Sequence, residues 1–95
     1  QGIDALEAEE AAAVVAETLR DSLDARAVAA LHELLVDGGS DTAGAVARRH
    51  GLSAPTLSRA KARLGRLAAE ALRDVPDGAR RPFWDALERE LARAG

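Results

Sequence analysis

Residues 42–67 read TAGAVARRHGLSAPTLSRAKARLGRL, and this stretch carries the clearest structural signals in the chain. Gly51 comes four residues after Ala47, where a short helix can end in the left-handed conformation that glycine adopts at little cost. Ser53 then provides a side chain that can cap a second helix, and Pro55 fits into its first turn. We therefore predict a short helix before the glycine and a long helix after Ser53.

On both sides of this stretch, apolar residues recur at intervals of three and four, the spacing of amphipathic helices. No segment shows the alternation of a β-strand. We predict five helices. The first covers residues 3–23, and the second runs from Asp24 to the Gly38-Gly39 turn. The third is capped by Ser40 or Asp41 and runs to about His50, the fourth runs from Ser53 to about Asp74, and the fifth begins near Pro82. We expect an all-α domain in which residues 3–23 form an acidic arm outside the core, and in which Phe83, Trp84, Leu87 and Leu91 share one face of the last helix.

Length and composition restrict the class of protein. With 95 residues, of which 47% are hydrophobic, the chain has enough apolar material for one small domain. It contains no cysteine, which excludes disulfides, and no apolar run long enough to span a membrane, so we expect a cytoplasmic protein without membrane contact. We divide it into residues 1–2, interpreted as the remnant of a cleaved tag, an acidic helix at 3–23, a core at 24–75, and a C-terminal helix within 76–95.

The charges are segregated along the chain. Residues 1–40 contain nine acidic and two basic side chains, whereas residues 41–66 contain six basic side chains and a single acid, Asp41. Residues 67–95 are close to neutral, with five bases and six acids. The overall net charge of −3 therefore hides a basic segment that coincides with the predicted pair of helices.

The same segment resembles the helix-turn-helix of bacterial transcription proteins, and most nearly region four of sigma factors. The similarity covers about residues 23–67. It is carried by Gly38 to Ser40, Val46-Ala47, Gly51-Leu52-Ser53, Thr56-Leu57 and Arg63-Leu64. It implies that the long helix from Ser53 is a recognition helix that enters the major groove of double-stranded DNA, and it implies RNA polymerase as a protein partner.

The resemblance and the charge pattern together nominate two sets of residues. The side chains expected to face DNA bases are Ser53, Ala54, Thr56, Ser58, Arg59 and Arg63, with Arg59 the best candidate to bind a guanine edge. Those expected to contact phosphates are Arg48, Arg49, His50, Lys61 and Arg66. Neutralising about five phosphates would give a slope of log affinity against log salt on the order of −4 to −5.

The sequence is also compatible with two other classes of protein. The paired helices also suit a helical protein-interaction module that binds a partner helix through Phe83, Trp84 or the acidic segment. A third alternative is a homodimeric repressor, which predicts recognition helices about 34 Å apart. No nucleophile motif is present, and His32 and His50 lack the spacing of metal ligands, so we expect neither an enzyme nor a cofactor.

Overall fold

The computed structural model describes residues 2–37 and 42–93, and within these ranges the chain contains helices and no strand. This confirms the prediction of an all-α fold with five α-helices. In chain order the elements are α1 (Gly2–Ser22), α2 (Ala25–Asp37), α3 (Ala43–Arg49), α4 (Ala54–Arg73), the short 3₁₀ helix η1 (Asp77–Ala79) and α5 (Arg80–Ala92).

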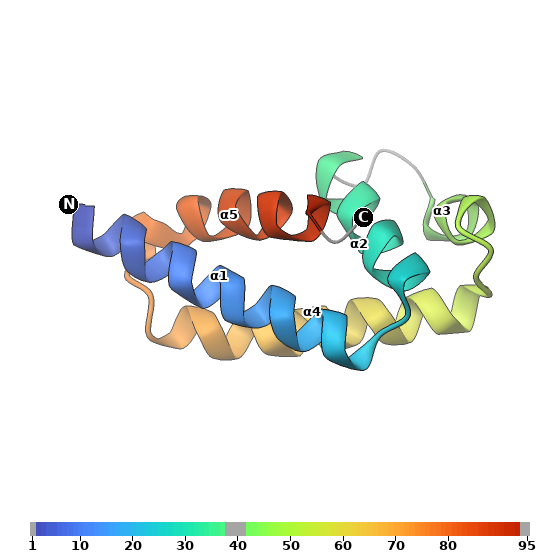
Figure 1. Cartoon of the computed structure of the whole chain (residues 1–95), viewed down its shortest axis with the longest axis horizontal. Coiled ribbons are helices and arrows are strands. Elements are labelled where there is room, and N and C mark those ends of the chain that lie inside the picture. The colour runs from blue at the N-terminus through green and yellow to red at the C-terminus, as the bar shows by residue number, and fades with distance from the viewer. Residues whose placement is uncertain (1, 38–41, 94–95) are drawn as a thin grey trace.

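The molecule is elongated, with extents of 41 × 27 × 21 Å, and its two ends differ in structure. Helices α1, α4 and α5 run along its length, whereas α3 and the start of α4 lie together at one end (Figure 1). Helix α2 contacts α3, α4 and α5, so it ties this end to the long helices. The first part of the basic segment predicted from the sequence is therefore placed at one tip of the molecule, and the rest of it continues along α4.

Helix α1 is part of the core, so the expectation of an acidic arm was wrong. Ala8, Ala12, Ala16 and Leu19 are fully buried, and α1 packs along α5. The physical reason is the size of the alanines, because small side chains at four-residue spacing let two helices approach closely. The acidic side chains occupy the opposite face, which leaves α1 charged on one side and packed on the other.

The last helix starts earlier than predicted and buries fewer aromatic atoms. It begins at Arg80, directly after η1, rather than near Pro82. Phe83, Leu87 and Leu91 are buried as expected, but Trp84 is 37% exposed. Adjacent residues on an α-helix point about 100° apart, so Phe83 and Trp84 cannot both face the core. Their rings instead meet edge to face, with centroids 5.3 Å apart.

The start of α3 also differs from the prediction. Ser40 and Asp41, the two expected caps, lie outside the described residues, and the cap of the described helix is Thr42. Its hydroxyl oxygen accepts a hydrogen bond from the backbone N–H of Ala45 at 3.1 Å. This bond fixes where α3 begins, and the glycine turn fixes where it ends. Together they give α3 its length of seven residues.

Candidate nucleic-acid interface

The connection between α3 and α4 has the geometry that its sequence predicts. Gly51 adopts a φ of +70°, in the left-handed region. The backbone N–H of Leu52 donates to the carbonyl of Ala47 at 2.8 Å, and that of Gly51 donates to the carbonyl of Arg48 at 3.1 Å. These two bonds form a Schellman motif, which ends a helix and satisfies its last carbonyl groups. The turn is thus fixed by backbone hydrogen bonds.

Side chains from α2 support this turn, which the sequence did not reveal. Arg26 donates to the carbonyl of Gly51 at 3.4 Å and forms an ion pair with Asp24 at 3.0 Å. The hydrogen bond from the Arg26 guanidinium lowers the pKa of Asp24 from its ordinary value. The carboxylate of Asp24 also accepts from the backbone N–H of Arg26 at 2.8 Å at the start of α2. The beginning of α2 and the turn before α4 are therefore linked.

Two glycines in this region should respond in opposite ways to alanine. Gly51→Ala should lower the free energy of unfolding by about 1 to 2 kcal/mol, because a side chain is strained at positive φ. Gly44→Ala should raise it by up to about 1 kcal/mol, because a Cβ there meets no atom within 4 Å and alanine favours the helix. Urea denaturation of both variants measures this difference. Equal effects of the two substitutions would contradict the description of the turn.

The N-terminus of α4 is capped and open to solvent. The Ser53 hydroxyl oxygen accepts from the backbone N–H of Thr56 at 3.3 Å, and the two hydroxyl oxygens lie 2.7 Å apart. Ser53, Ala54 and Ser58 are exposed, whereas Thr56 is half-buried. Of these four predicted base contacts, Ser53 and Thr56 thus already serve to cap the helix, while Ala54 and Ser58 are free to meet a ligand.

In the part of α4 nearer the turn, the outward face carries two arginines. Leu57, Ala60 and Leu64 are buried, which turns the opposite face of the helix to solvent. Arg59 and Arg66 lie on this face, are exposed, and form no ion pair with any residue in 2–37 or 42–93. Being seven residues apart, they are separated by about 10 Å along the helix axis. Both guanidinium groups are therefore available to an external anion.

The two other α4 cations that the sequence nominated, Arg63 and Lys61, point to the flanks of the helix. The Arg63 Nε donates to the hydroxyl of Ser22, at the end of α1, at 2.9 Å. Lys61 lines a hollow on another side of α4 together with Leu35 and Trp84. The structure thus brings Arg59 and Arg66 onto one face and places Arg63 and Lys61 away from it, a distinction that the linear sequence did not show.

At the end of α3, two of the three predicted phosphate contacts are held by an acid from α2. Glu33 forms an ion pair with Arg49, and its carboxylate lies 2.7 Å from the Nε2 of His50. Hydrogen bonds from Arg49 and then His50 lower the pKa of Glu33 from its ordinary value. The carboxylate is thus ionised at neutral pH, and this contribution to stability is lost only as the pH falls through the lowered pKa. Arg48 is exposed and has no ion-pair partner in the described part of the chain.

Removing the Glu33 charge should strengthen the attraction of this end for anions. Glu33→Gln keeps the shape of the side chain but removes the carboxylate that pairs with Arg49 and lies beside His50, so duplex DNA should bind a few times more tightly at low salt, with a salt slope steeper by about one. Fluorescence anisotropy with a labelled duplex measures both quantities. Glu7→Gln, at the far end of α1, is the control for net charge. An unchanged affinity in Glu33→Gln would show that Arg49 and His50 do not contact phosphate.

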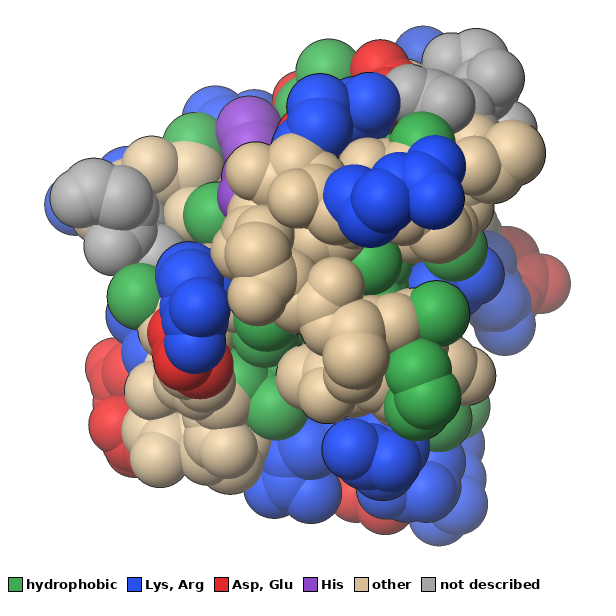
Figure 2. All heavy atoms as spheres, turned by 90° about the vertical axis from the view of Figure 1, so that its right-hand side faces the viewer, with side chains coloured by type: hydrophobic (Ala, Val, Ile, Leu, Met, Phe, Trp, Pro, Cys, Tyr) green, Lys and Arg blue, Asp and Glu red, His purple; other side chains and the backbone are tan. Residues whose placement is uncertain are grey.

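Basic side chains are prominent on the surface of the molecule's tip. Figure 2 looks onto the end that carries α3 and the start of α4, where Lys and Arg side chains surround a centre of neutral side chains and backbone. Acidic side chains lie mostly toward the edges of this view. Such a surface suits a polyanion that contacts uncharged groups at its centre and charged groups at its edge.

Other kinds of site find less support in the described ranges. No three His, Asp or Glu side chains there are placed to hold a metal ion, and none of the helices in these ranges is long and apolar enough to cross a membrane. No protein family matches the chain, and neither a curated protein nor a solved structure is significantly similar to it. What indicates the function is therefore the arrangement of side chains on the surface of α3 and α4.

Proposed function

We propose that the chain is a sequence-specific DNA-binding domain of a bacterial transcription regulator or sigma-like factor, with α4 as a recognition helix in the major groove. The observation that supports this most strongly is the free outward face of α4, with Arg59 and Arg66 exposed beside a fixed glycine turn. A major groove about 12 Å wide admits one α-helix, and the helix N-terminus at Ser53 would enter first.

The roles of the side chains follow from their positions on α4. Ala54, Ser58 and Arg59 lie in the first two turns and would face base edges, with Arg59 donating two hydrogen bonds to a guanine. Arg66 lies about 10 Å further along the helix axis and would contact a phosphate. Arg48, at the end of α3, would contact the backbone on the other side of the turn. Ser53 contributes its capped helix terminus, whose free N–H groups attract phosphate.

The salt dependence of duplex binding tests this proposal. Arg48, Arg59 and Arg66 have no ion-pair partner among the described residues, and Lys61 is exposed on another side of α4, so three or four phosphates would be neutralised. The slope of log affinity against log salt should therefore be about −3 to −4, shallower than the sequence alone suggests. Anisotropy titrations of a mixed-sequence duplex at increasing salt measure it. A slope near zero, or no binding at low salt, would overturn the proposal.

A helical protein-interaction module is the second candidate, and one observation favours it. Trp84 is partly exposed and borders two separate hollows, one lined by Leu34 and Leu35 and the other by Ala69 and Leu72. Exposed tryptophans are enriched at the energetic centres of protein interfaces. If Trp84 anchors a protein partner in place of DNA, duplex affinity should be absent at low salt.

A further inference from the structure

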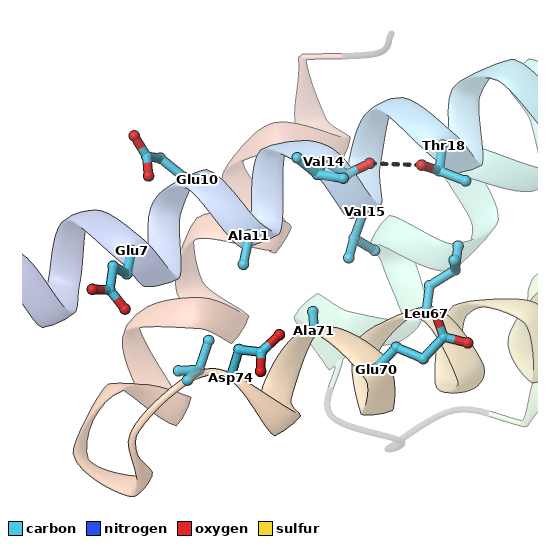
Figure 3. A pocket seen from close by; sticks show the side chains of 11 residues that line it. Glu7, Glu10, Ala11, Val14, Val15, Thr18, Leu67, Glu70, Ala71 and Asp74 are labelled. Carbon is cyan, nitrogen blue, oxygen red and sulfur yellow. Dashed lines mark hydrogen bonds between the residues drawn. The ribbon is translucent and has the colours of Figure 1, made fainter.

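A groove runs between α1 and α4 near the end of the molecule opposite α3. It has a volume of about 480 Å³. Figure 3 shows its two walls, with side chains of α1 on one side and of α4 on the other. Ala11, Val15 and Thr18 repeat along α1, and Leu67, Ala71 and Asp74 repeat along α4. The first and last of these residues on each wall are seven positions apart, which is about 10 Å or two turns of helix.

The interior of the groove is apolar. Val15 and Val75 are buried, while Ala11, Leu67 and Ala71 are half-exposed along the sides. The hydroxyl of Thr18 donates to the carbonyl of Val14 at 2.9 Å, so this polar group is satisfied within its own helix. Val14 is 65% exposed at the upper edge. This leaves apolar surface that a partner could cover.

The rim of the groove is acidic. Glu7 and Glu10 on α1 and Glu70 and Asp74 on α4 are all exposed. None of the four forms an ion pair with a described residue of the chain. Four uncompensated carboxylates around an apolar floor favour an occupant that is apolar on one side and positively charged at its edges.

We infer that this groove binds a basic amphipathic helix of a partner protein. The partner helix would lie along the groove, with apolar residues at positions i, i+3 or i+4, and i+7 between α1 and α4. Its Lys or Arg side chains on both edges would meet Glu7 and Glu10 on one side, and Glu70 and Asp74 on the other. The groove is lined by residues of the second half of α4, beyond the part of the helix that carries Arg59.

A second copy of the chain cannot supply such a helix while it remains folded. Among the described helices of eight or more residues, α4 alone carries a clear excess of basic side chains, and its apolar face is buried by Leu57, Leu64 and Leu72. Duplex DNA is also excluded, because the rim would repel its phosphates. Charge complementarity therefore assigns the groove to a basic helix from another protein.

Two synthetic peptides of about 18 residues test this inference, a length that favours helix formation. Both carry leucine at intervals of three and four; one has lysine along the edges of this stripe and the other has glutamate. Fluorescence anisotropy should show the lysine peptide bound at least about tenfold more tightly than the glutamate peptide. Equal affinities for the two peptides, or no binding of the lysine peptide, would overturn the inference.

Matched substitutions locate the peptide. Val14→Asp should weaken the binding of the lysine peptide about tenfold or more, because the apolar side of the peptide would cover the new carboxylate, and the cost of removing it from water exceeds its attraction to lysine. Val36→Asp, at a similarly exposed valine on α2, should leave its affinity unchanged. Glu10→Lys combined with Glu70→Lys should reverse the preference toward the glutamate peptide. If Val14→Asp and Val36→Asp lose the same affinity for the lysine peptide, or if the Glu10→Lys, Glu70→Lys double variant keeps its preference for that peptide, the peptide binds elsewhere and the inference is contradicted.

Circular dichroism shows whether each variant keeps its helices, and all of these positions are exposed on helix surfaces. Sedimentation of the chain alone tests whether a second copy of the chain occupies the groove. A dimer that Val14→Asp dissociates would assign the groove to a second copy and contradict a partner helix. A monomer that binds the lysine peptide supports the inference, and this result does not depend on whether the tip binds DNA.

Discussion

Replacing Phe83 with alanine is expected to lower the free energy of unfolding by about 3 to 5 kcal/mol, a large share of what holds a domain of this size together. Phe83 is fully buried and is the largest such side chain in the described part of the core. It lies on α5, which packs against α1 and α2, so the cavity would affect several helices together. Urea denaturation followed by circular dichroism measures the loss.

Trp84→Ala is the matched control for this prediction. The two aromatic side chains are neighbours in the chain and their rings touch, but Trp84 is 37% exposed and borders two surface hollows. Its removal should cost clearly less than that of Phe83, because less apolar surface returns to water. If the two variants lose the same stability, α5 does not pack in the orientation described.

Replacing Arg59 with alanine should cost about 1 to 3 kcal/mol of binding to the preferred duplex, or about five- to 150-fold in affinity. The preferred duplex is obtained by selection from a random-sequence pool. Selection with Arg59→Ala should show weaker preference at one base pair, because the side chain that distinguishes guanine is gone. Arg66→Ala should instead weaken all duplexes similarly and reduce the salt slope by about one.

The chain offers a control of equal charge on the same helix. Arg73 is exposed on α4, has no ion pair with a described residue, and lies about 21 Å from Arg59 along the axis. Arg73→Ala should leave both affinity and sequence preference nearly unchanged. Since alanine is the best helix former, none of these variants should unfold α4. A loss in Arg73→Ala equal to that in Arg59→Ala would show that only net charge matters.

The features that sequence predicted well are local. Gly51, Ser53 and the spacing of leucines in α4 act within a few residues of themselves, so their signals are readable without knowing the fold. The number of helices and the exposure of Arg59 follow from the same periodicity. These features are confirmed as structure, whereas their use in DNA binding stays a prediction.

The features that sequence missed are contacts between distant residues. Glu33 on α2 pairs with Arg49 and His50 at the end of α3. Arg63 on α4 donates a hydrogen bond to Ser22 at the C-terminal end of α1. No local pattern shows which acid will face which base once the helices pack. The burial of α1 was missed for a related reason, because an alanine stripe between glutamates has a weak apolar signal and depends on a close-fitting partner.

The groove between α1 and α4 illustrates the same limit. Glu70 and Glu10 are 60 positions apart in the sequence, and each alone looks like an ordinary surface acid. Only the side-by-side arrangement of the two helices places them on opposite edges of an apolar floor (Figure 3). This groove gives the acidic segment a second role beyond packing, because its inner stripe supports α5 while its outer residues define a docking surface.

The most direct measurement is a nuclear magnetic resonance titration of the isotope-labelled chain with a short duplex. If α4 reads DNA, the backbone amide signals of residues 48 and 53–66 should shift progressively as duplex is added. Those of residues 7–18, along α1, should stay in place. Shifts concentrated around Trp84 or along α1, with the signals of residues 53–66 unmoved, would contradict the assignment of α4 as the DNA-reading helix.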